Sequence, residues 1–522
     1  MNHRTPAPST VLEALKQRAK DSPRATAFVV DGERVTHLQL RRRAADLARR
    51  LSRIGLRRDD RCVITLSSPL DTIRLCYACH MLAAIPVVVD PVHWEMVRER
   101  RLAAIHPAFV IADYPSRRNA RVGDRPLEIE FAFLDTVTPS PSSVLTMPGP
   151  DDIAYLQFTS GTMGEAKAAQ VSHRALAAAL DAMQERYGIG PDDITTGRAP
   201  LSHSTGLVRY AFGTVWFGAA SYLLGPRAGH VAHWLELVAQ TRATVTNASD
   251  FSFRVATATR LPELPSLASL RIATSGGEIV RASTILEFER KFGLSRIVQP
   301  AYGLSEATLI VASAVAGDEI VTDTTGAVSC GTPMPGLEVR IADASGQAVG
   351  AGEEGEILVR GAQVFSGYAD DYRATDEVLR NGWLHTGDVG VLDAAGRLFP
   401  RARRRALIKR AGVAIAPREV EEPIEPLQYV AGVAAVGVLL PDRLTEDIVV
   451  VVEATTTDPR ELFALATLVD MVVREAVGAR PGQVRLVSPG AIPRTAVGKA
   501  RYLELRQLVL DGRLDAATLY LK

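Results

Sequence analysis

The spacing of apolar residues divides the first part of the chain into alternating helical and strand-like segments. VLEALKQRAKDSP (residues 11–23) and LQLRRRAADLARRLSRIGL (38–56) repeat apolar residues at helical spacing, which predicts amphipathic helices. CVITLS (62–67) and PVVVD (86–90) are short apolar runs typical of buried strands. The alternation continues as far as IVQPAYG (297–303), and it predicts βα units with largely parallel sheets.

The pattern changes after about residue 325. GLEVRIADASGQAVGAGEEGEILVRG (336–361) alternates apolar and polar residues between glycines, which predicts antiparallel strands. A basic segment, RARRRALIKR (401–410), is followed by a smaller α/β stretch. We therefore predict an α/β protein with a large N-terminal domain (1–402) of βα sheets and a small β-rich subdomain, and a small mobile C-terminal α/β domain (403–522).

Composition restricts the possible classes of protein. The chain has 522 residues, 47% of them hydrophobic, which is enough for two or more domains with sizeable cores. The formal net charge of +1 gives no reason to expect a nucleic acid, and the basic segment lacks interleaved aromatic residues. The longest apolar runs, such as AAIPVVV, fall far below the roughly 20 residues of a membrane span. Because the N-terminus lacks an apolar signal core and only four cysteines are present, we expect a cytoplasmic protein.

The sequence CYACH has the spacing of a haem-attachment site, with Cys76, Cys79 and His80. The surrounding segment PLDTIRLCYACHMLAAI (69–85) has apolar residues at helical spacing and leads into the strand PVVVD. We interpret it as a buried amphipathic helix rather than as a haem or metal site.

TSGTMGEAKAAQ (159–170) has the composition of a phosphate-binding loop. It follows a strand-like segment, YLQF, and we expect a helix after it. Small residues let backbone amides approach phosphate oxygens, hydroxyl groups add donors, and Lys167 adds a point charge. The glycines and the lysine lie too close together for a Walker loop.

Five other stretches carry polar residues in turns. In chain order they are APLSHSTGL with His203, TSGGE with Gly276, Gly277 and Glu278, QPAYGLSEAT with Tyr302, Gly303, Ser305 and Glu306, LHTGDVG with Asp388, and IPRTAVGKARY with Gly498 and Lys499. We expect a short turn after a strand at Tyr302 and a tight turn at Asp388. Each stretch alone has an ordinary structural explanation.

Taken together and in this order, the six stretches resemble the adenylate-forming superfamily, which includes acyl-CoA synthetases, fatty acyl-AMP ligases, peptide-synthetase adenylation domains and luciferases. The resemblance extends from ERVTHLQL near the start to PRTAVGKAR near the end. QPAYGLSEATL is similar to the fatty acyl-AMP ligase branch. The segment from Ala307 to VSCGTP is too short for the insertion of that branch, which favours the CoA ligases.

The resemblance implies a two-step reaction and assigns the residues. A carboxylic acid and ATP give acyl-AMP, and a thiol then displaces AMP. Lys499 bridges the carboxylate and the α-phosphate, Glu306 holds Mg²⁺, Tyr302 packs on adenine, and Asp388 accepts hydrogen bonds from ribose. The implied nucleotide site consists of Thr159, Ser160, Gly161, Thr162, Lys167, Gly277, Glu278, Ala301, Tyr302, Gly303, Ser305, Asp388 and Arg403.

The resemblance also implies an acyl pocket and a thiol site. The pocket consists of His203, Phe251, Gly276 and Leu304, with His203 also counted among the catalytic residues. The second step uses the small domain, which rotates about a hinge at Arg405, while Gly412 and Arg410 meet the pantetheine arm of CoA or of a carrier protein. The implied cofactors and substrates are ATP, Mg²⁺ and CoA.

The chain departs from the family pattern in two places. In the phosphate loop, Met163, Ala166 and Ala168 replace a usual hydroxyl residue, proline and glycine. At the hinge, Ala402 replaces glycine, Arg405 replaces Asp or Lys, and Ala406 replaces an acidic residue, whereas KRAGVAIAPREVEE (409–422) matches.

These departures leave several functions open. The chain is an acyl-activating ligase for CoA or carrier phosphopantetheine, a variant that mainly converts preformed acyl-AMP, or a non-catalytic nucleotide-binding scaffold. Light-emitting oxygenation belongs to the same family, and nothing in the sequence favours it. The small or apolar pocket residues suit an aliphatic or terpenoid-like acid better than an amino acid, although Asp250 keeps an ammonium partner available. The sequence does not predict the oligomeric state.

Overall fold

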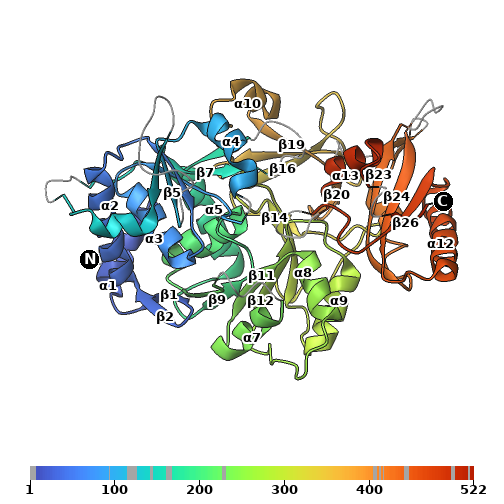
Figure 1. Cartoon of the computed structure of the whole chain (residues 1–522), viewed down its shortest axis with the longest axis horizontal. Helices are drawn as coiled ribbons and strands as arrows, with labels where there is room; N and C mark the ends of the chain where they lie inside the picture. The colour runs from blue at the N-terminus through green and yellow to red at the C-terminus, as the bar shows by residue number, and fades with distance from the viewer. Residues whose placement is uncertain are drawn as a thin grey trace.

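The structure is a computed structural model, and the chain forms a large body with a smaller one at its C-terminal end (Figure 1). It describes residues 8–92, 94–113, 126–140, 145–159, 167–225, 231–403, 408–410, 413–415, 417–439, 446–494, 500–514 and 518–521. Lys499 and most of the phosphate loop lie outside these residues.

The largest sheet has nine strands in the order β15-β14-β13-β12-β11-β9-β10-β1-β2. The neighbours from β13 through to β1 are parallel, and both edges of the sheet end in antiparallel pairs. This confirms the predicted βα architecture. The strands are β1 (Thr26–Val30), β2 (Glu33–Thr36), β9 (Ile194–Gly197), β10 (Ala220–Leu223), β11 (Val245–Ala248), β12 (Ile272–Gly276), β13 (Val298–Tyr302), β14 (Ala312–Ser313) and β15 (Thr332–Pro333).

A second, six-stranded sheet has the order β6-β5-β3-β4-β7-β8, and only the β7–β8 pair is antiparallel. The predicted strands CVITLS and PVVVD are β3 and β4 of this sheet. Its strands are β3 (Arg61–Thr65), β4 (Ile85–Val88), β5 (Phe109–Ala112), β6 (Leu127–Glu130), β7 (Ile153–Phe158) and β8 (Ala168–Ser172).

Helices cover these sheets and bury their apolar faces in one large core and several smaller clusters. The two predicted N-terminal helices are confirmed as α1 and α2, and the side chain of Thr10 caps α1 while Thr36 and Gln39 form a capping box on α2. The helices are α1 (Val11–Asp21), α2 (His37–Arg53), α3 (Pro69–His80), α4 (Trp94–Ile105), α5 (His173–Tyr187), η2 (Thr205–Phe212), α6 (Gly213–Phe217), α7 (Val231–Thr241), α8 (Asp250–Ala258) and α9 (Ala282–Phe292), with short 3₁₀ turns at η1 (Phe131–Thr136) and η3 (Ser305–Ala307).

The β-rich subdomain is an antiparallel sheet in the order β16-β17-β19-β18, with β20 also paired to β19. This confirms the antiparallel strands predicted for residues 336–361. The elements are β16 (Leu337–Ala342), β17 (Glu354–Gly361), α10 (Tyr372–Val378), β18 (Leu379–Arg380), β19 (Trp383–Leu392) and β20 (Leu398–Arg403).

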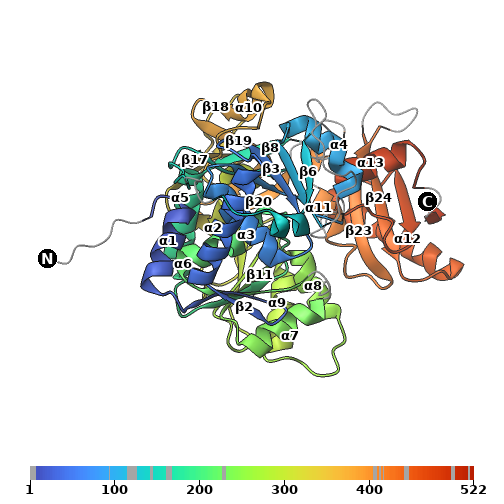
Figure 2. The ribbon, with the colours of Figure 1, turned by 60° about the vertical axis from the view of Figure 1, so that its left-hand side comes forward.

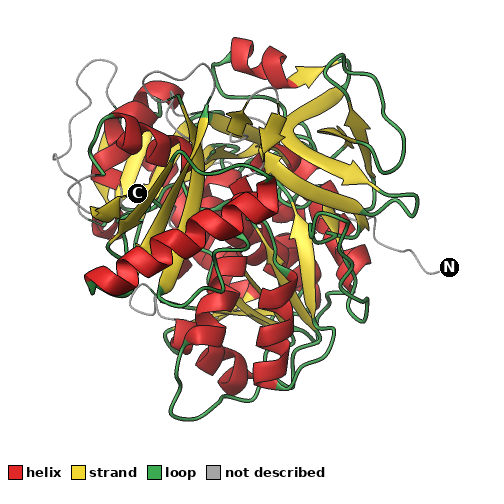
Figure 3. Ribbon diagram, turned by 90° about the vertical axis from the view of Figure 1, so that its right-hand side faces the viewer, coloured by secondary structure: helices red, strands yellow, loops and turns green. Residues whose placement is uncertain are grey.

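The C-terminal body has its own four-stranded sheet, β23-β24-β25-β26, with apolar clusters on both faces. The long helix α12 lies across this sheet (Figure 3), and α11 contacts β20 where the two bodies meet (Figure 2). The predicted boundary at 402/403 falls within the end of β20 and stays a prediction. The elements are β21 (Ile408–Arg410), β22 (Val413–Ile415), α11 (Pro417–Glu421), β23 (Val430–Val438), β24 (Asp447–Ala454), α12 (Pro459–Val477), β25 (Gln483–Val487), α13 (Tyr502–Leu510) and β26 (Thr518–Leu521).

The CYACH segment forms part of α3 and is buried in the main core. Cys76 and Cys79 are free thiols without solvent exposure, and His80 Nε2 lies 2.6 Å from the carbonyl oxygen of Ala154. Burial lowers the pKa of His80 to about 4. Among the described residues, no cluster of His, Cys, Asp and Glu is suited to a metal ion, and no helix has the length and apolarity to cross a membrane.

Candidate active site

The site lies where four neighbouring parallel strands end. β9, β11, β12 and β13 are adjacent in the large sheet, and their carboxyl ends therefore meet at one edge. In open α/β sheets this edge is the usual place for a ligand. The last residues of these strands and the segments that follow them carry the predicted residues His203, Phe251, Gly276, Gly277, Glu278, Tyr302 and Ser305.

Tyr302 and Asp388 come from different sheets and meet at this edge. The Tyr302 hydroxyl donates a hydrogen bond of 2.7 Å to Asp388 Oδ2. Asp388 is buried, and it pairs in register with Arg403 on β20. The expected tight turn at Asp388 is wrong, because Asp388 lies within the long strand β19, directly after Gly387 with its positive φ of 71°. The tertiary fold thus brings together three residues predicted for the nucleotide.

Glu306 and Lys167 are linked through one aromatic side chain. The Tyr368 hydroxyl donates a hydrogen bond of 2.8 Å to Glu306 Oε1, and Lys167 Nζ lies 5.3 Å from the centroid of the Tyr368 ring. Ser305 Oγ lies 2.6 Å from Ser204 Oγ in the loop after β9. Carboxylate oxygen is the ligand type that Mg²⁺ prefers, so Glu306 fits the predicted metal role. Sequence reasoning missed Tyr368, whose position follows only from the fold.

The phosphate loop connects two strands rather than a strand and a helix. β7 and β8 pair as an antiparallel hairpin, and the Thr159 amide donates a hydrogen bond of 3.0 Å to the Lys167 carbonyl. The expected strand-to-helix connection is therefore wrong, since AAQVS forms β8 before α5 begins. Ala168 is paired with Phe158 and is not among the residues with positive φ. Replacing the family's glycine by Ala168 thus introduces no backbone strain. Ser160, Gly161 and Thr162 lie outside the described residues.

The predicted acyl positions surround the ends of β11, β12 and β13. A Cβ on Gly276 would lie 2.6 Å from the carbonyl oxygen of Ala301, so only glycine fits beside β13 at that point. Glu278 Oε1 accepts a hydrogen bond of 2.6 Å from the Phe251 amide, in the first turn of α8. Leu304 packs against the main core, and His203 Nδ1 accepts a hydrogen bond of 3.2 Å from the Thr205 amide.

The C-terminal body reaches this site through Arg494, five residues before Lys499. The Arg494 guanidinium lies 5.6 Å from the centroid of the Phe251 ring. Arg494 and Ala500, which flank residues 495–499, form a β-bridge, and this pair is the base of that stretch. Buried Glu453 fixes this base, since it accepts hydrogen bonds from the Gly490 and Ile492 amides and pairs with Arg494. The Arg494–Ala500 base thus adjoins the predicted acyl residue Phe251.

A second contact between the two bodies is a cluster of charges that sequence reasoning missed. Arg281 pairs with Asp250 at 2.5 Å and also with Glu425 of the C-terminal body, and Arg254 lies 3.6 Å from Glu425. Asp250 has no solvent exposure and also accepts a hydrogen bond of 3.0 Å from the Arg281 amide. Asp250, the possible partner of a substrate ammonium group, is therefore already paired with Arg281. No local sequence pattern links residues 250, 281 and 425.

Beside this cluster, Glu421 is a buried carboxyl whose charged form is disfavoured. Its oxygens accept hydrogen bonds from the Ala435 amide at 2.8 Å and the Tyr502 hydroxyl at 3.1 Å. Burial raises the pKa of Glu421 from 4.5 to about 7, partly offset by these hydrogen bonds and by Arg281, while Glu425 adds to the rise. The unfolded chain releases this proton near pH 4.5 and the folded chain near pH 7. The ionisation of Glu421 therefore lowers the free energy of unfolding as pH rises from about 4.5 to about 7.

We therefore expect Glu421→Gln to stabilise the C-terminal body at pH 8 by up to about 3 kcal/mol relative to wild type, and not at pH 4. Glutamine keeps the shape and accepts from the Ala435 amide without a charge. Urea unfolding across this pH range measures the difference. The matched control is Glu422→Gln, since Glu422 is exposed. An equal effect of Glu421→Gln at both pH values would contradict the raised pKa of Glu421.

The residues predicted for CoA are only partly described. Arg410 Nη1 lies 2.9 Å from Oδ1 of buried Asp447, so its charge is already paired within the C-terminal body. Gly412 and the predicted hinge residue Arg405 lie outside the described residues. The thiol site therefore stays a prediction.

Comparison with known proteins identifies the family. The AMP-binding enzyme family matches residues 15–369, more than half of the chain. The chain belongs to the AMP-binding enzymes. Feruloyl-CoA synthase from an Amycolatopsis species is 30% identical over 458 residues, which cover 86% of this chain and 90% of that relative. Indoleacetate–CoA ligase from Aromatoleum aromaticum is 30% identical over 520 residues, which cover 95% and 98%.

This AMP-binding enzyme also shares its fold with solved relatives. The o-succinylbenzoate CoA synthetase of Bacillus subtilis, solved with ATP and a magnesium ion, superimposes with a TM-score of 0.78 at 23% identity, over 94% of this chain and 98% of that one. The predicted superfamily and α/β fold class are confirmed. The AMP-binding enzyme is an adenylating, acyl-CoA ligase-like member of the AMP-forming acid–thiol ligases.

Proposed function

We propose that this enzyme converts a carboxylic acid to its CoA thioester through an acyl-AMP intermediate. The observation that carries the proposal is the contact of Arg494, five residues before Lys499, with Phe251, at the same sheet edge as the Tyr302–Asp388 pair and Glu306. Closure of the C-terminal body over this edge would bring a lysine to the place where a carboxylate and an α-phosphate meet. Positive charge at that place stabilises the charge that develops in the transition state.

In the first step, a carboxylate oxygen attacks the α-phosphorus and the bond to the leaving pyrophosphate breaks. Lys499 holds the two anions together, and Lys167 with Thr159 faces the outer phosphates. Asp388 accepts hydrogen bonds from ribose, with Tyr302 against the base. Bound at Glu306, Mg²⁺ would supply neutralisation of the phosphate charge.

In the second step, the thiol sulfur of CoA attacks the acyl carbonyl carbon. The carbon–oxygen bond to AMP breaks, AMP leaves with the electron pair, and the thiol proton passes to solvent. Movement of the C-terminal body would withdraw Lys499 and admit the pantetheine arm. The cluster of Arg281, Asp250 and Glu425 must open for this movement, because it joins the two bodies.

A second candidate function is conversion of preformed acyl-AMP with weak adenylation. The substitution of Met163 for a hydroxyl residue favours it, because a lost charge-assisted hydrogen bond costs about 1.5–3 kcal/mol. The close relatives named as CoA ligases favour the full reaction.

Pyrophosphate exchange across a panel of carboxylic acids tests the full reaction, with a parallel thioester assay that starts from synthetic acyl-AMP. We expect both assays to give product with the cognate acid and CoA. Thioester formation without exchange would favour the second candidate. Failure of both assays, with nucleotide still bound, would favour a non-catalytic scaffold.

A further inference from the structure

One face of the large sheet carries a row of polar residues, which lie further from the carboxyl ends of the strands than the predicted acyl positions do. Thr274 is in register with both Asn247 and Gln299, and Gly276 is in register with Ala301. Side chains two residues apart on a strand share a face, so Asn247, Thr274 and Gln299 lie on the face of Gly276 and Ala301, roughly 7 Å further from the strand ends.

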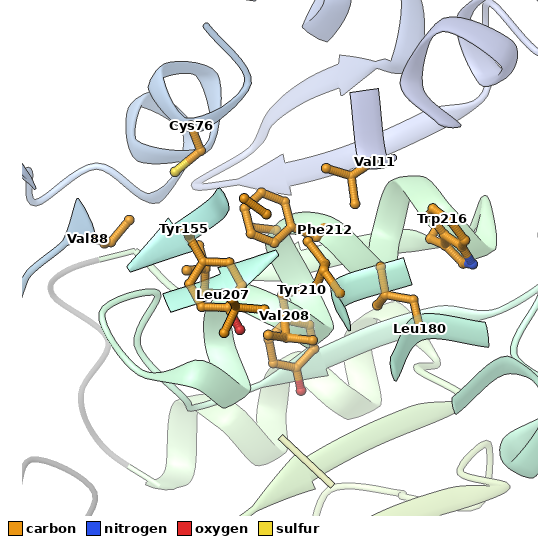
Figure 4. Close-up of a cluster of buried hydrophobic side chains, with 14 of the residues drawn as sticks. Val11, Cys76, Val88, Tyr155, Leu180, Leu207, Val208, Tyr210, Phe212 and Trp216 are labelled. Atoms are coloured by element: carbon orange, nitrogen blue, oxygen red, sulfur yellow. The ribbon is translucent and has the colours of Figure 1, made fainter. Parts of the chain in front are cut away.

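This face is the one that η2 and α5 cover. Val245, Ile272 and Ala301 belong to the main core together with Tyr187 of α5 and Tyr210 of η2, whereas Ala248, Ala273 and Val298 pack in the cluster under α7, α8 and α9. Tyr210 makes the contact directly, since its hydroxyl bonds to Asn247 Oδ1 and to the Thr196 carbonyl at 2.9 Å. Figure 4 shows its phenol pointing away from Phe212.

Arg209, the residue before Tyr210, is a buried cation on the same helix. It is 4% exposed, and its guanidinium lies 5.6 Å from the centroid of the Tyr187 ring. The Tyr187 carbonyl accepts a hydrogen bond of 2.9 Å from Arg271, which directly precedes β12. Arg209 and Tyr187 therefore lie at the amino end of β12, on the face that bears Thr274 and Gln299.

Several polar atoms in this region have no hydrogen-bond partner among the described residues. They are Arg209 Nε and Nη1, the Tyr187 hydroxyl and Gln299 Oε1, on side chains that are 4%, 5% and 2% exposed. The ion pairs of the described chain also include none to Arg209. Buried polar groups are normally hydrogen-bonded, and a buried charge without a counter-charge is costly. The two Arg209 nitrogens and the Tyr187 hydroxyl can donate, and the guanidinium is charged, whereas Gln299 Oε1 is an acceptor.

We propose that Arg209 and Tyr187, on the same face of the sheet as Gln299, form a distal subsite that donates to an acceptor oxygen, of a carboxylate or a ketone, at the far end of the acid. The inference rests on the proposed function and adds the substrate class: an acid with a second oxygen group beyond an apolar middle. The eight-residue π-helix η2 supports it, because π-helical turns are rare and frequent at functional sites. A site built to hydrogen-bond a substrate group strongly rejects an analogue that lacks the group.

The test compares three series of acids of matched chain length: unsubstituted, ω-oxo and α,ω-dicarboxylic. We expect wild type to prefer an oxygen-bearing series over the unsubstituted one in kcat/KM for pyrophosphate exchange. Arg209→Met is expected to lower that preference about 10- to 100-fold, the value of a charge-assisted hydrogen bond. Gln299→Glu adds a negative charge on the same face of the sheet and is expected to harm dicarboxylic acids more than ω-oxo acids.

The control is Arg186→Met, one residue before Tyr187, whose guanidinium bonds to the Ser313 and Pro333 carbonyls instead. It should leave the preference unchanged. Equal use of all three series by wild type, or an unchanged preference in Arg209→Met, would overturn the subsite while the ligase activity stands. No activity with any acid, and no thioester from any acyl-AMP, would overturn the proposed function itself. If Arg209→Met does not fold, Tyr187→Phe, which removes the hydroxyl donor beside Arg209, gives the same decision.

Discussion

Replacing Lys499 with alanine is expected to reduce pyrophosphate exchange by at least about 100-fold. The first step brings a carboxylate toward a polyphosphate, so a cation at their meeting point acts on the transition state more than on either substrate. Arg494, which pairs with Ala500 just after Lys499, adjoins Phe251 at the sheet edge.

We expect Lys499→Ala to impair adenylation and to leave thioester formation intact. Lys499→Ala should form thioester from synthetic acyl-AMP at a rate close to wild type, because the lysine serves only adenylation. Lys16→Ala, on the exposed face of α1, controls for the loss of a lysine. Normal exchange in Lys499→Ala would show that this lysine is not the adenylation cation.

The second large effect is expected for Gly303→Ala. A Cβ at residue 303 would lie 1.7 Å from the carbonyl oxygen of Leu309 and 2.9 Å from Cα of Ile310. These are backbone atoms, and they cannot rotate away as a side chain would. The turn has little freedom to adjust, since Thr308 and Leu309 already have positive φ values of 50° and 105°.

We expect Gly303→Ala to lower the free energy of unfolding by about 3 kcal/mol or more and to weaken AMP binding, because the turn links Tyr302 to Glu306. Thermal unfolding and calorimetric titration with AMP measure the two effects. Gly190→Ala is the matched control, since Gly190 has no atom within 4 Å of the added Cβ. Normal AMP binding in a folded Gly303→Ala would contradict the assignment of this turn to the nucleotide.

The sequence predicted much of the fold because its apolar periods are local and strong. Helical spacing in residues 11–23 and 38–56 corresponds to α1 and α2, and the alternating segment 336–361 corresponds to β16 and β17. The local prediction failed where short segments form strands through distant partners. AAQVS became β8 because β7 and the segment around Tyr368 pair with it, and Asp388 joined β19 between β17 and β20.

The sequence alone predicted the candidate residues that lie in short motifs: the hydroxyl-rich phosphate loop, Glu306, Asp388 and Lys499. Which of them meet was decided only by the tertiary structure. Tyr302 contacts Asp388, and Asp250 is bound to Arg281 and not free for substrate. The sequence likewise did not predict that Arg209 lies near Tyr187 at the amino end of β12. The physical reason is that these contacts join residues from separate elements, which only the packing of sheets and helices brings within hydrogen-bonding distance.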